Sequence, residues 1–287
     1  MKASTFKKIS CQLIALTLTA AGLSAESTAR IVTVGGAATE IVFALNRGDD
    51  VVGVDLSSTY PQAATKLPQV GYVRSISAEG VLALEPTHIV GTSDIGPANA
   101  LNQIKASGVP TSVIPSPGSP EDLYQAIQVL GEELKQTEAA TQLKSKIESQ
   151  LASIQKLETK PKVVFFMSSP GLGHLNAAGR GTKATAMIEL AGGENVIRSH
   201  PGYKGISHEA LVALQPDIIL IGLAEGMPHN ETRILDSVLH NAAWQNVPAV
   251  REKQVHTVPL GRTLSFGVRV GEAALELNQL FAETVSN

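Results

Sequence analysis

The sequence has little cysteine, few aromatic residues and few charges, and each shortage excludes a class of protein. Its 287 residues include one cysteine, six phenylalanines, four tyrosines and one tryptophan. So few rings leave little surface for stacking bases, and a formal charge of −3 lacks the positive excess that phosphate backbones attract. We therefore expect no nucleic-acid partner. With 43% hydrophobic and 17% charged residues, the chain is too apolar to be disordered, and its length suits one large domain or two.

The amino terminus has the pattern of a secretion signal within residues 1–29. Three lysines among the first eight residues precede an apolar stretch at 9–23, and small residues suited to cleavage follow at 24–29. The apolar stretch falls short of the roughly 20 residues that span a membrane. Cys11 lies at the start of this stretch, whereas a lipid-modified cysteine would end it. We therefore expect a periplasmic protein that is not a lipoprotein.

Removal of the signal leaves a chain without cysteine. The first 25 residues hold three lysines and no acidic residue, so the remainder carries 20 Lys and Arg against 26 Asp and Glu, a net charge of −6. Such a chain forms no disulfide and offers no thiolate ligand or thiol nucleophile. Its stability must come from its core.

Short apolar runs alternate with segments of helical spacing along the rest of the chain. Helical spacing occurs at residues 39–45, 77–84 and 121–134. The runs that predict strands are 31–34, 51–54, 87–90, 112–114, 162–167, 217–221 and 255–258. Strands that alternate with helices form parallel sheets covered by helices. The pattern predicts an α/β protein, and it restarts near residue 162.

An internal repeat divides the chain into two related halves. Residues 76–90 match residues 206–220 at a constant offset of 130, with seven identities. Farther upstream, Gly48-Asp-Asp-Val is echoed by Gly193-Glu-Asn-Val. The larger offset there is explained by a loop at residues 168–182, whose Gly- and Ser-rich composition predicts irregular backbone. We expect two doubly wound lobes with parallel sheets, at residues 30–136 and 161–287.

The segment between these lobes, residues 137–160, predicts one long connecting helix. The helix is expected to begin at the capping residue Thr137 and to end at Glu158, with apolar residues at helical spacing from Leu143 to Leu157, and its length is about 33 Å. A single helical connection implies a stiff pair of lobes with a cleft between them. Ligands bind at the carboxyl ends of parallel strands, and two such edges would face each other across this cleft.

The chain contains no recognisable catalytic signature. It has no Gly-x-Ser-x-Gly elbow, no His-Glu-x-x-His and no phosphate-binding Gly-x-x-x-x-Gly-Lys-Ser/Thr loop. An exported enzyme that uses Ser168-Ser169 and a histidine is an alternative, but no base and orienting partner accompany these serines. A repeated α/β chain with a cleft and without such motifs indicates a ligand-capture protein and not an enzyme.

Three segments resemble the periplasmic haem-binding proteins of bacterial haem-uptake ABC transporters. They are residues 67–86, residues 34–45 and residues 177–195, and the first contains Gly-Tyr-x-Arg-x-x-Ser-Ala-Glu-Gly. The resemblance implies a class III periplasmic binding protein-like fold, with two lobes joined by a helix. It also implies a monomer that captures ferric haem in the cleft and delivers it to the permease dimer of the inner membrane, downstream of an outer-membrane haem receptor. Haem is then cargo and not a catalytic cofactor.

The same architecture also serves relatives that bind a siderophore-iron complex or cobalamin, and this remains the alternative. Such a cleft would be lined by several arginines or tryptophans and would hold no axial ligand. Trp244 is the one tryptophan in the sequence.

The resemblance implies that Tyr72 is the axial ligand of the haem iron. A phenolate is a hard anionic donor that suits ferric iron. A phenol ionises near pH 10 and needs help to do so at neutral pH. Arg74 follows two residues later, and in an extended stretch it would point to the same side and supply positive charge.

Other residues are candidates for supporting roles. Tyr203 occupies the position equivalent to Tyr72 in the repeat, so we expect it to face Tyr72 across the cleft and contact the porphyrin or a propionate. Some members of the family ligate a second haem with a histidine of the loop that holds His174. The candidates for pairing with propionates are Arg74, Arg180, Lys204 and Arg262.

Two glutamates fall at matched positions of the repeat. Glu79 and Glu209 each lie in the first turn of a short predicted helix, where a carboxylate also complements the helix dipole. In relatives of this architecture a glutamate at this place in each lobe docks on arginines of the permease. The resemblance therefore implies that both residues contact the permease dimer.

Overall fold

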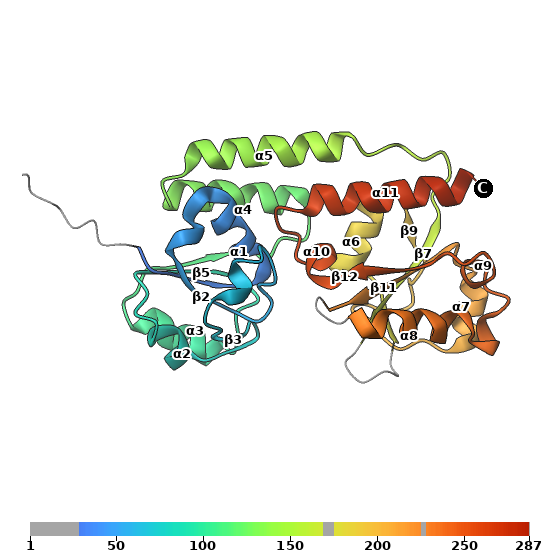
Figure 1. Ribbon diagram of the computed structural model, residues 1–287, viewed down its shortest axis with the longest axis horizontal. Helices are drawn as coiled ribbons and strands as arrows, with labels where there is room; N and C mark the ends of the chain where they lie inside the picture. Colours follow the sequence, from blue (N-terminus) through green and yellow to red (C-terminus); the bar gives the residue numbers. More distant parts are fainter. Residues whose placement is uncertain (1–28, 169–174, 225–227, 287) are drawn as a thin grey trace, which may run out of the picture.

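Two α/β lobes lie side by side and are bridged by helices along one edge (Figure 1). The computed structural model describes residues 29–168, 175–224 and 228–286. The proposed signal peptide lies almost entirely outside these residues. No helix among the described residues has both the length and the apolar character needed to cross a membrane.

The N-terminal lobe is built on a parallel four-stranded sheet with the order β2-β1-β5-β6. Two further strands form a separate hairpin, and helices cover both faces of the sheet. The strands are β1 (Ile31–Val34), β2 (Val51–Val54), β3 (Gly71–Tyr72), β4 (Ser75–Ile76), β5 (His88–Thr92) and β6 (Thr111–Ile114). The helices are α1 (Gly36–Val42), α2 (Ala78–Leu82), α3 (Ala98–Ala106) and α4 (Pro120–Glu133), with short turns of helix at Phe43–Arg47, Gly48–Asp50 and Ala64–Lys66.

The C-terminal lobe has a sheet of order β10-β8-β7-β11-β12, with β9 also paired to β7. The strands are β7 (Lys162–Ser168), β8 (Leu175–Ala178), β9 (Glu194–Asn195), β10 (Tyr203–Lys204), β11 (Ile218–Leu223) and β12 (Val255–Pro259). The helices are α6 (Lys183–Leu190), α7 (His208–Leu214), α8 (Pro228–Leu239), α9 (Pro248–Arg251), α10 (Leu260–Leu264) and α11 (Val270–Ser286), with a helical turn at Ala242–Trp244. The α/β class and the two lobes expected from the sequence are confirmed.

The internal repeat corresponds to equivalent elements in the two lobes. The segment from α2 to β5 matches the segment from α7 to β11. Both helices are capped alike, because Ser77 Oγ accepts the Gly80 N–H at 3.0 Å and Ser207 Oγ accepts the Ala210 N–H at 3.2 Å. The constant offset of 130 therefore reflects a local structure that the two lobes share.

The loop expected at residues 168–182 is partly a strand, so that expectation was wrong for residues 175–178. These residues form β8, which runs antiparallel to β7 with Phe166 opposite Ala177. β10 then adds to β8, with Tyr203 opposite Ala178. Pairing with an existing strand edge satisfies the backbone of a sequence whose small residues carry little strand preference of their own.

The connecting helix is shorter than the sequence indicates. α5 begins at Thr137 as expected but ends at Ala152, not at Glu158. The reason is a contact from α11: Asn278 accepts the Gln155 N–H and donates to the Gln155 carbonyl, both at 2.9 Å. These bonds satisfy the backbone that a longer helix would have used, so the chain continues to β7 as irregular structure.

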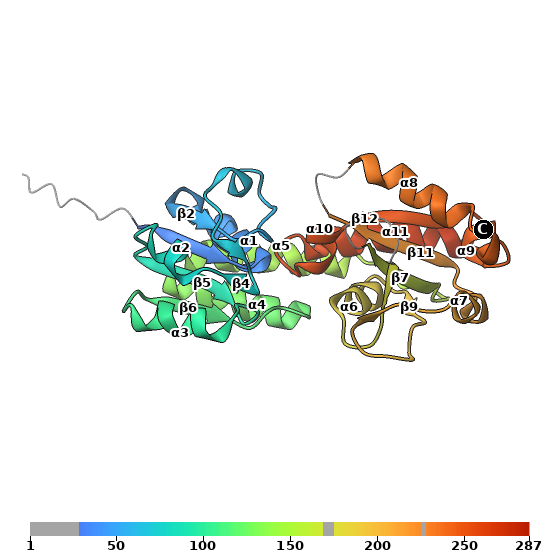
Figure 2. The same ribbon diagram turned by 90° about the horizontal axis from the view of Figure 1, so that it is seen from below.

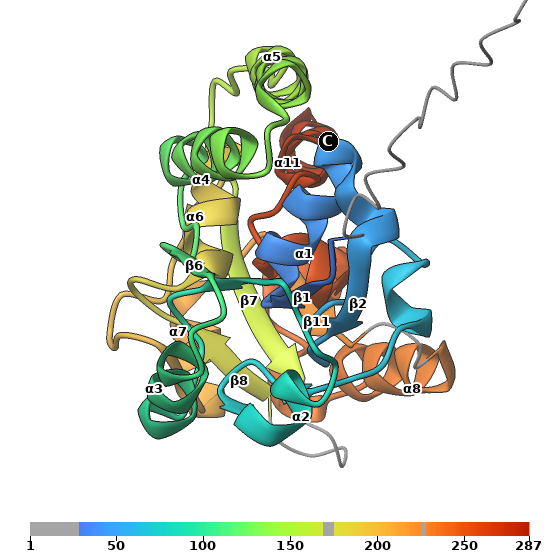
Figure 3. The same ribbon diagram turned by 90° about the vertical axis from the view of Figure 1, so that its left-hand side faces the viewer.

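The lobes are not joined by α5 alone. α5 packs against α4 of the first lobe and α11 of the second, and Figure 3 shows these three helices together on one side of the molecule. One buried cluster includes Ile31 of β1, Ile147 of α5, Phe165 of β7 and Phe281 of α11. The core thus continues from one lobe into the other, and their connection is broad.

A buried ion pair also connects the two lobes. Glu40 of α1 is 2% exposed and accepts a hydrogen bond from Arg269 Nη2 at 2.8 Å and one from Ser265 Oγ at 3.1 Å. The Arg269 guanidinium lies 4.0 Å from the centre of the Tyr60 ring. Burial raises the pKa of Glu40 above its ordinary value, against Arg269 and Ser265, which lower it.

Candidate functional site

Tyr72 lies on an exposed hairpin at the carboxyl edge of the N-terminal sheet. β3 and β4 pair antiparallel, with Tyr72 opposite Ser75, and 44% of the Tyr72 surface is exposed. Gly71 enters the hairpin with φ +108°, and a Cβ there would lie 2.8 Å from the Ser75 carbonyl oxygen. In Figures 1 and 2 the hairpin lies on the side of its lobe that faces the other lobe.

Buried Asp55 fixes the position of this hairpin, a role that the sequence analysis missed. Asp55 follows β2 and is 1% exposed. Its Oδ2 accepts the Val73 N–H at 3.1 Å, and its Oδ1 accepts the Gly35 N–H at 2.7 Å. Ser57 and Ser58 donate hydroxyl hydrogen bonds to the same carboxylate. One side chain therefore joins the ends of two strands to the residue next to Tyr72.

The expectation that Arg74 follows Tyr72 in an extended stretch was wrong. Val73 and Arg74 form the two-residue turn between β3 and β4, because Tyr72 pairs with Ser75. The turn packs on the loop after β5, where the Gly96 N–H donates to the Val73 carbonyl at 2.8 Å. Arg74 is exposed at the tip of the hairpin. It is near Tyr72 because the chain turns there, and not because the two side chains share one face of an extended strand.

Lys183 contacts the N-terminal lobe at the same edge and was also missed by the sequence analysis. It is the first residue of α6, after the capping residue Thr182. Its Nζ donates to Ser116 Oγ at 2.9 Å, and Ser116 follows β6 of the other lobe. Burial lowers the pKa of Lys183, Asp94 opposes this effect, and the positive charge of Arg74 adds to it.

Tyr203 is placed differently from Tyr72, although the two are equivalent in the repeat. It is half-buried in β10, against the core that continues between the lobes. Burial raises the pKa of Tyr203, while hydrogen bonds with the Ala184 backbone and the Thr182 side chain lower it. Its hydroxyl is thus held at the first turn of α6, unlike the exposed phenol of Tyr72.

The remaining cations proposed for propionate pairing have different surroundings. Arg262 of α10 forms ion pairs with Glu276 at 2.7 Å and Glu272 at 3.8 Å, both on α11. Arg180 donates to the Arg198 carbonyl. Lys204 is exposed on the edge strand β10. The structure therefore assigns the Arg262 guanidinium to α11, because two carboxylates already neutralise it.

Glu79 and Glu209 are both exposed in the first turns of α2 and α7. Hydrogen bonds from its own backbone and from Ser207 lower the pKa of Glu209, and the neighbouring His208 adds a smaller effect. One exposed carboxylate thus stands at the same local position in each lobe.

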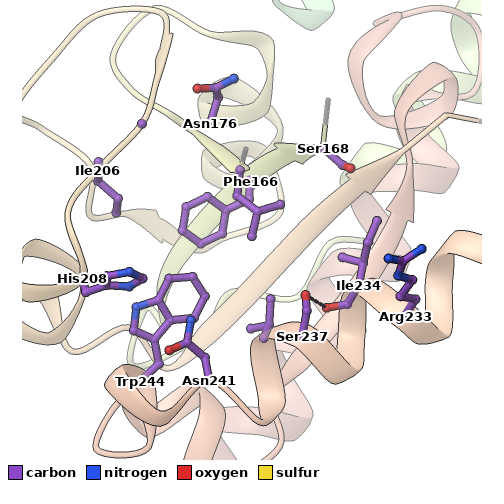
Figure 4. A pocket seen from close by; sticks show the side chains of 13 residues that line it. Phe166, Ser168, Asn176, Ile206, His208, Arg233, Ile234, Ser237, Asn241 and Trp244 are labelled. Atoms are coloured by element: carbon purple, nitrogen blue, oxygen red, sulfur yellow. Dashed lines mark hydrogen bonds between the residues drawn. The ribbon is translucent and has the colours of Figure 1, made fainter. Parts of the chain in front are cut away.

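A cavity of about 520 Å³ lies within the C-terminal lobe, between β7, α7 and α8 (Figure 4). Phe166 and Trp244 stack there with ring centres 6.1 Å apart, and the His208 ring is tilted against Trp244 with ring centres 5.4 Å apart. The Trp244 Nε1 is buried and has no hydrogen-bond partner among the described residues. Among the described residues, none of those expected to hold haem lines this cavity.

The described residues contain no group of three or more His, Cys, Asp or Glu side chains placed to hold a bare metal ion. His174 lies outside the described residues, so its prediction as a ligand of a second haem stays a prediction. The chemically distinct feature of the interlobe edge is therefore an exposed phenol with two cations, Arg74 and Lys183, contributed by different lobes.

Comparison with known proteins identifies the family. The model of the periplasmic binding protein family matches residues 31–260. The chain belongs to the periplasmic binding protein family. A solved structure of the periplasmic heme-binding protein RhuT from Roseiflexus sp. RS-1, in apo form, is 32% identical and superposes with a TM-score of 0.82. That match covers 90% of this chain and 99% of RhuT.

Curated relatives in the same family carry different descriptions. The uncharacterized ABC transporter substrate-binding lipoprotein YvrC of Bacillus subtilis is 28% identical over 86% of this chain and 78% of its own length. The vitamin B12-binding protein of Vibrio parahaemolyticus is 25% identical over 91% of this chain and 95% of its own length. Membership of the family therefore leaves the ligand to be decided by the site.

Proposed function

We propose that this periplasmic binding protein is exported by its amino-terminal signal, binds ferric haem between its lobes and delivers it to an inner-membrane ABC permease. The single observation that carries this proposal is Tyr72, a phenol that is 44% exposed on a hairpin facing the other lobe. Capture and release require no chemical reaction, so the protein acts as a carrier and not as an enzyme.

The surroundings of Tyr72 suit an axial ligand to ferric iron. Phenolate is a hard anionic donor that suits ferric iron. Arg74 lies in the turn next to Tyr72, and Asp55 holds the Val73 backbone, so the hairpin is fixed before any ligand arrives. RhuT, which is similar over nearly its whole length, is described as heme-binding. These points support haem over the cobalamin alternative.

Delivery requires a contact with the permease, and we assign it to Glu79 and Glu209. These exposed carboxylates occupy equivalent first turns in the two lobes. A pseudo-symmetric pair suits a partner with two-fold symmetry, because each carboxylate meets an equivalent surface. The relationship to an ABC transporter substrate-binding lipoprotein supports such a partner. We further propose that this chain, unlike that relative, is released without a lipid anchor.

The proposal is tested by titrating the mature protein with hemin and recording the visible spectrum. We expect the wild type to show the high-spin ferric spectrum of tyrosinate ligation, and Tyr72→Phe to lose it with an affinity about tenfold or more lower, which is about 1.4 kcal/mol or more. Tyr124→Phe, on α4, is the matched control and should behave as the wild type. Tyr203→Phe should keep the tyrosinate spectrum, because that hydroxyl is held by α6.

Two results would refute the assignment. If Tyr72→Phe gave the wild-type spectrum, Tyr72 would not be the ligand. If cyanocobalamin bound to the wild type and hemin did not, the cobalamin alternative would replace the haem proposal.

A further inference from the structure

We infer that Lys183 recognises a carboxylate of the bound tetrapyrrole, so that the C-terminal lobe contributes a charged contact while Tyr72 of the N-terminal lobe holds the iron. This inference rests on the proposed function, since it names how the same site distinguishes haem by its propionates. It begins from Lys183, a lysine whose hydrogen bond crosses the lobe boundary to a neutral partner.

The position of Lys183 favours contact with a ligand between the lobes. It opens α6 in the C-terminal lobe, yet its Nζ reaches Ser116 Oγ in the N-terminal lobe at 2.9 Å. Ser116 follows β6, and its N–H donates to Ser93 Oγ after β5. The ammonium therefore lies at the carboxyl ends of the parallel strands, where ligands of such sheets bind.

The hydrogen bonds of Lys183 leave it able to bind an anion. An ammonium group has three donors, and the structure gives Lys183 one hydrogen bond, to a neutral hydroxyl. Asp94 and Arg74 are the charged groups near it, and they act in opposite directions. A half-buried cation without a contacting carboxylate is under-compensated, and a propionate would supply the missing negative charge.

In the first turn of α6, the lysine side chain and not the helix backbone is available to bind a carboxylate. Thr182 Oγ1 accepts the Thr185 N–H at 3.1 Å, and the Ala184 backbone is hydrogen-bonded to Tyr203. These helix amides are already used, so an incoming carboxylate meets the ammonium and not the end of the helix. Arg262 is neutralised by α11, as described above, and does not compete for this contact.

The contact would join ligand binding to both lobes. A carboxylate that accepts a hydrogen bond from Lys183 takes the place of Ser116, a partner from the opposite lobe. The hydrogen bond between the two lobes is thereby exchanged for one between the ligand and the C-terminal lobe. Haem would then be held by its iron from one side and by a propionate from the other.

The test compares hemin with hemin dimethyl ester, which keeps the iron and masks both carboxylates. Wild type, Lys183→Met and the control Lys162→Met are titrated with each compound; Lys162 is exposed at the opposite end of β7. We expect the wild type and Lys162→Met to bind hemin about tenfold or more tightly than the ester, because a charge-assisted hydrogen bond is lost. Lys183→Met should bind both alike, with its tyrosinate spectrum intact. Circular dichroism checks that each variant is folded.

Each outcome decides between explanations. Equal affinity of the wild type for hemin and its ester would overturn carboxylate recognition while leaving the haem proposal in place. A preference for hemin that persists in Lys183→Met would show that Lys183 only links the lobes. Failure of the wild type to bind either compound would instead refute the proposed function, and this inference with it.

Discussion

Replacing Arg269 with methionine should destabilise the protein through Glu40. The carboxylate of Glu40 is 2% exposed and its Oε1 receives the Arg269 bond at 2.8 Å, while its Oε2 has no hydrogen-bond partner among the described residues. Removing one partner of such a pair leaves an uncompensated buried charge, which costs about 3–5 kcal/mol. The lost stacking of the guanidinium on Tyr60 adds about 1 kcal/mol.

The loss should depend on pH in a defined direction. Burial already raises the pKa of Glu40 from its ordinary 4.5, and Arg269 is the main influence that lowers it. A raised pKa means that stability from this group is full below pH 4.5 and falls as the pH rises through the folded-state value. Without Arg269 the folded-state pKa rises further, so the penalty continues to grow toward pH 7. The variant should therefore lose most at pH 7 and clearly less near pH 4.5.

Urea unfolding followed by circular dichroism at pH 7 and pH 4.5 measures both effects. The double variant Glu40→Gln with Arg269→Met is the control, because it removes the charge with its partner and should recover most of the stability lost at pH 7. A loss below about 1 kcal/mol at pH 7, or one equal at both pH values, would show that Glu40 is not an uncompensated charge in the variant.

Two further predictions concern the hairpin and the permease. Asp55→Asn should lower the free energy of unfolding by about 2–3 kcal/mol, because the new amide group faces donors such as the Gly35 N–H. The same variant should weaken the tyrosinate spectrum, since Asp55 holds the Val73 N–H. An unchanged spectrum would mean that Asp55 does not position Tyr72. The double variant Glu79→Arg, Glu209→Arg should bind hemin with an affinity within about twofold of the wild type. In proteoliposomes it should lower haem uptake through the cognate permease about tenfold or more. Unchanged uptake would reject these residues as the docking contacts.

Much of the fold follows from local sequence patterns. Strands such as Ile31–Val34 and Ile218–Leu223 are continuous apolar runs, and buried parallel strands need little else to be recognised. The repeat relates the two lobes through the sequence alone. Patterns of this kind depend on residues that are neighbours along the chain, so they can be recognised from the sequence without knowledge of tertiary contacts.

The differences arise where distant residues decide the structure. The end of α5 depends on Asn278, which lies more than a hundred residues away and bonds the Gln155 backbone. β8 depends on the free edge of β7, and Lys183 acquires its importance from Ser116 in the other lobe. No local spacing could place Lys183 at the lobe boundary, because its neighbours along the chain only predict the start of a helix.

The repeat also explains why Tyr72 is exposed for the proposed role of iron ligand while the equivalent Tyr203 is not. In the N-terminal lobe, β3 pairs only with β4 among the described strands, so Tyr72 stays exposed. In the C-terminal lobe the additional strand β8 gives β10 an edge to join, and Tyr203 is drawn under the first turn of α6. Lys183 opens α6 shortly after β8. The additional segment that contains β8 therefore precedes both the burial of Tyr203 and the placement of Lys183 between the lobes. In the proposed site, iron coordination therefore belongs to one lobe and carboxylate recognition to the other, although the two lobes are related by the repeat.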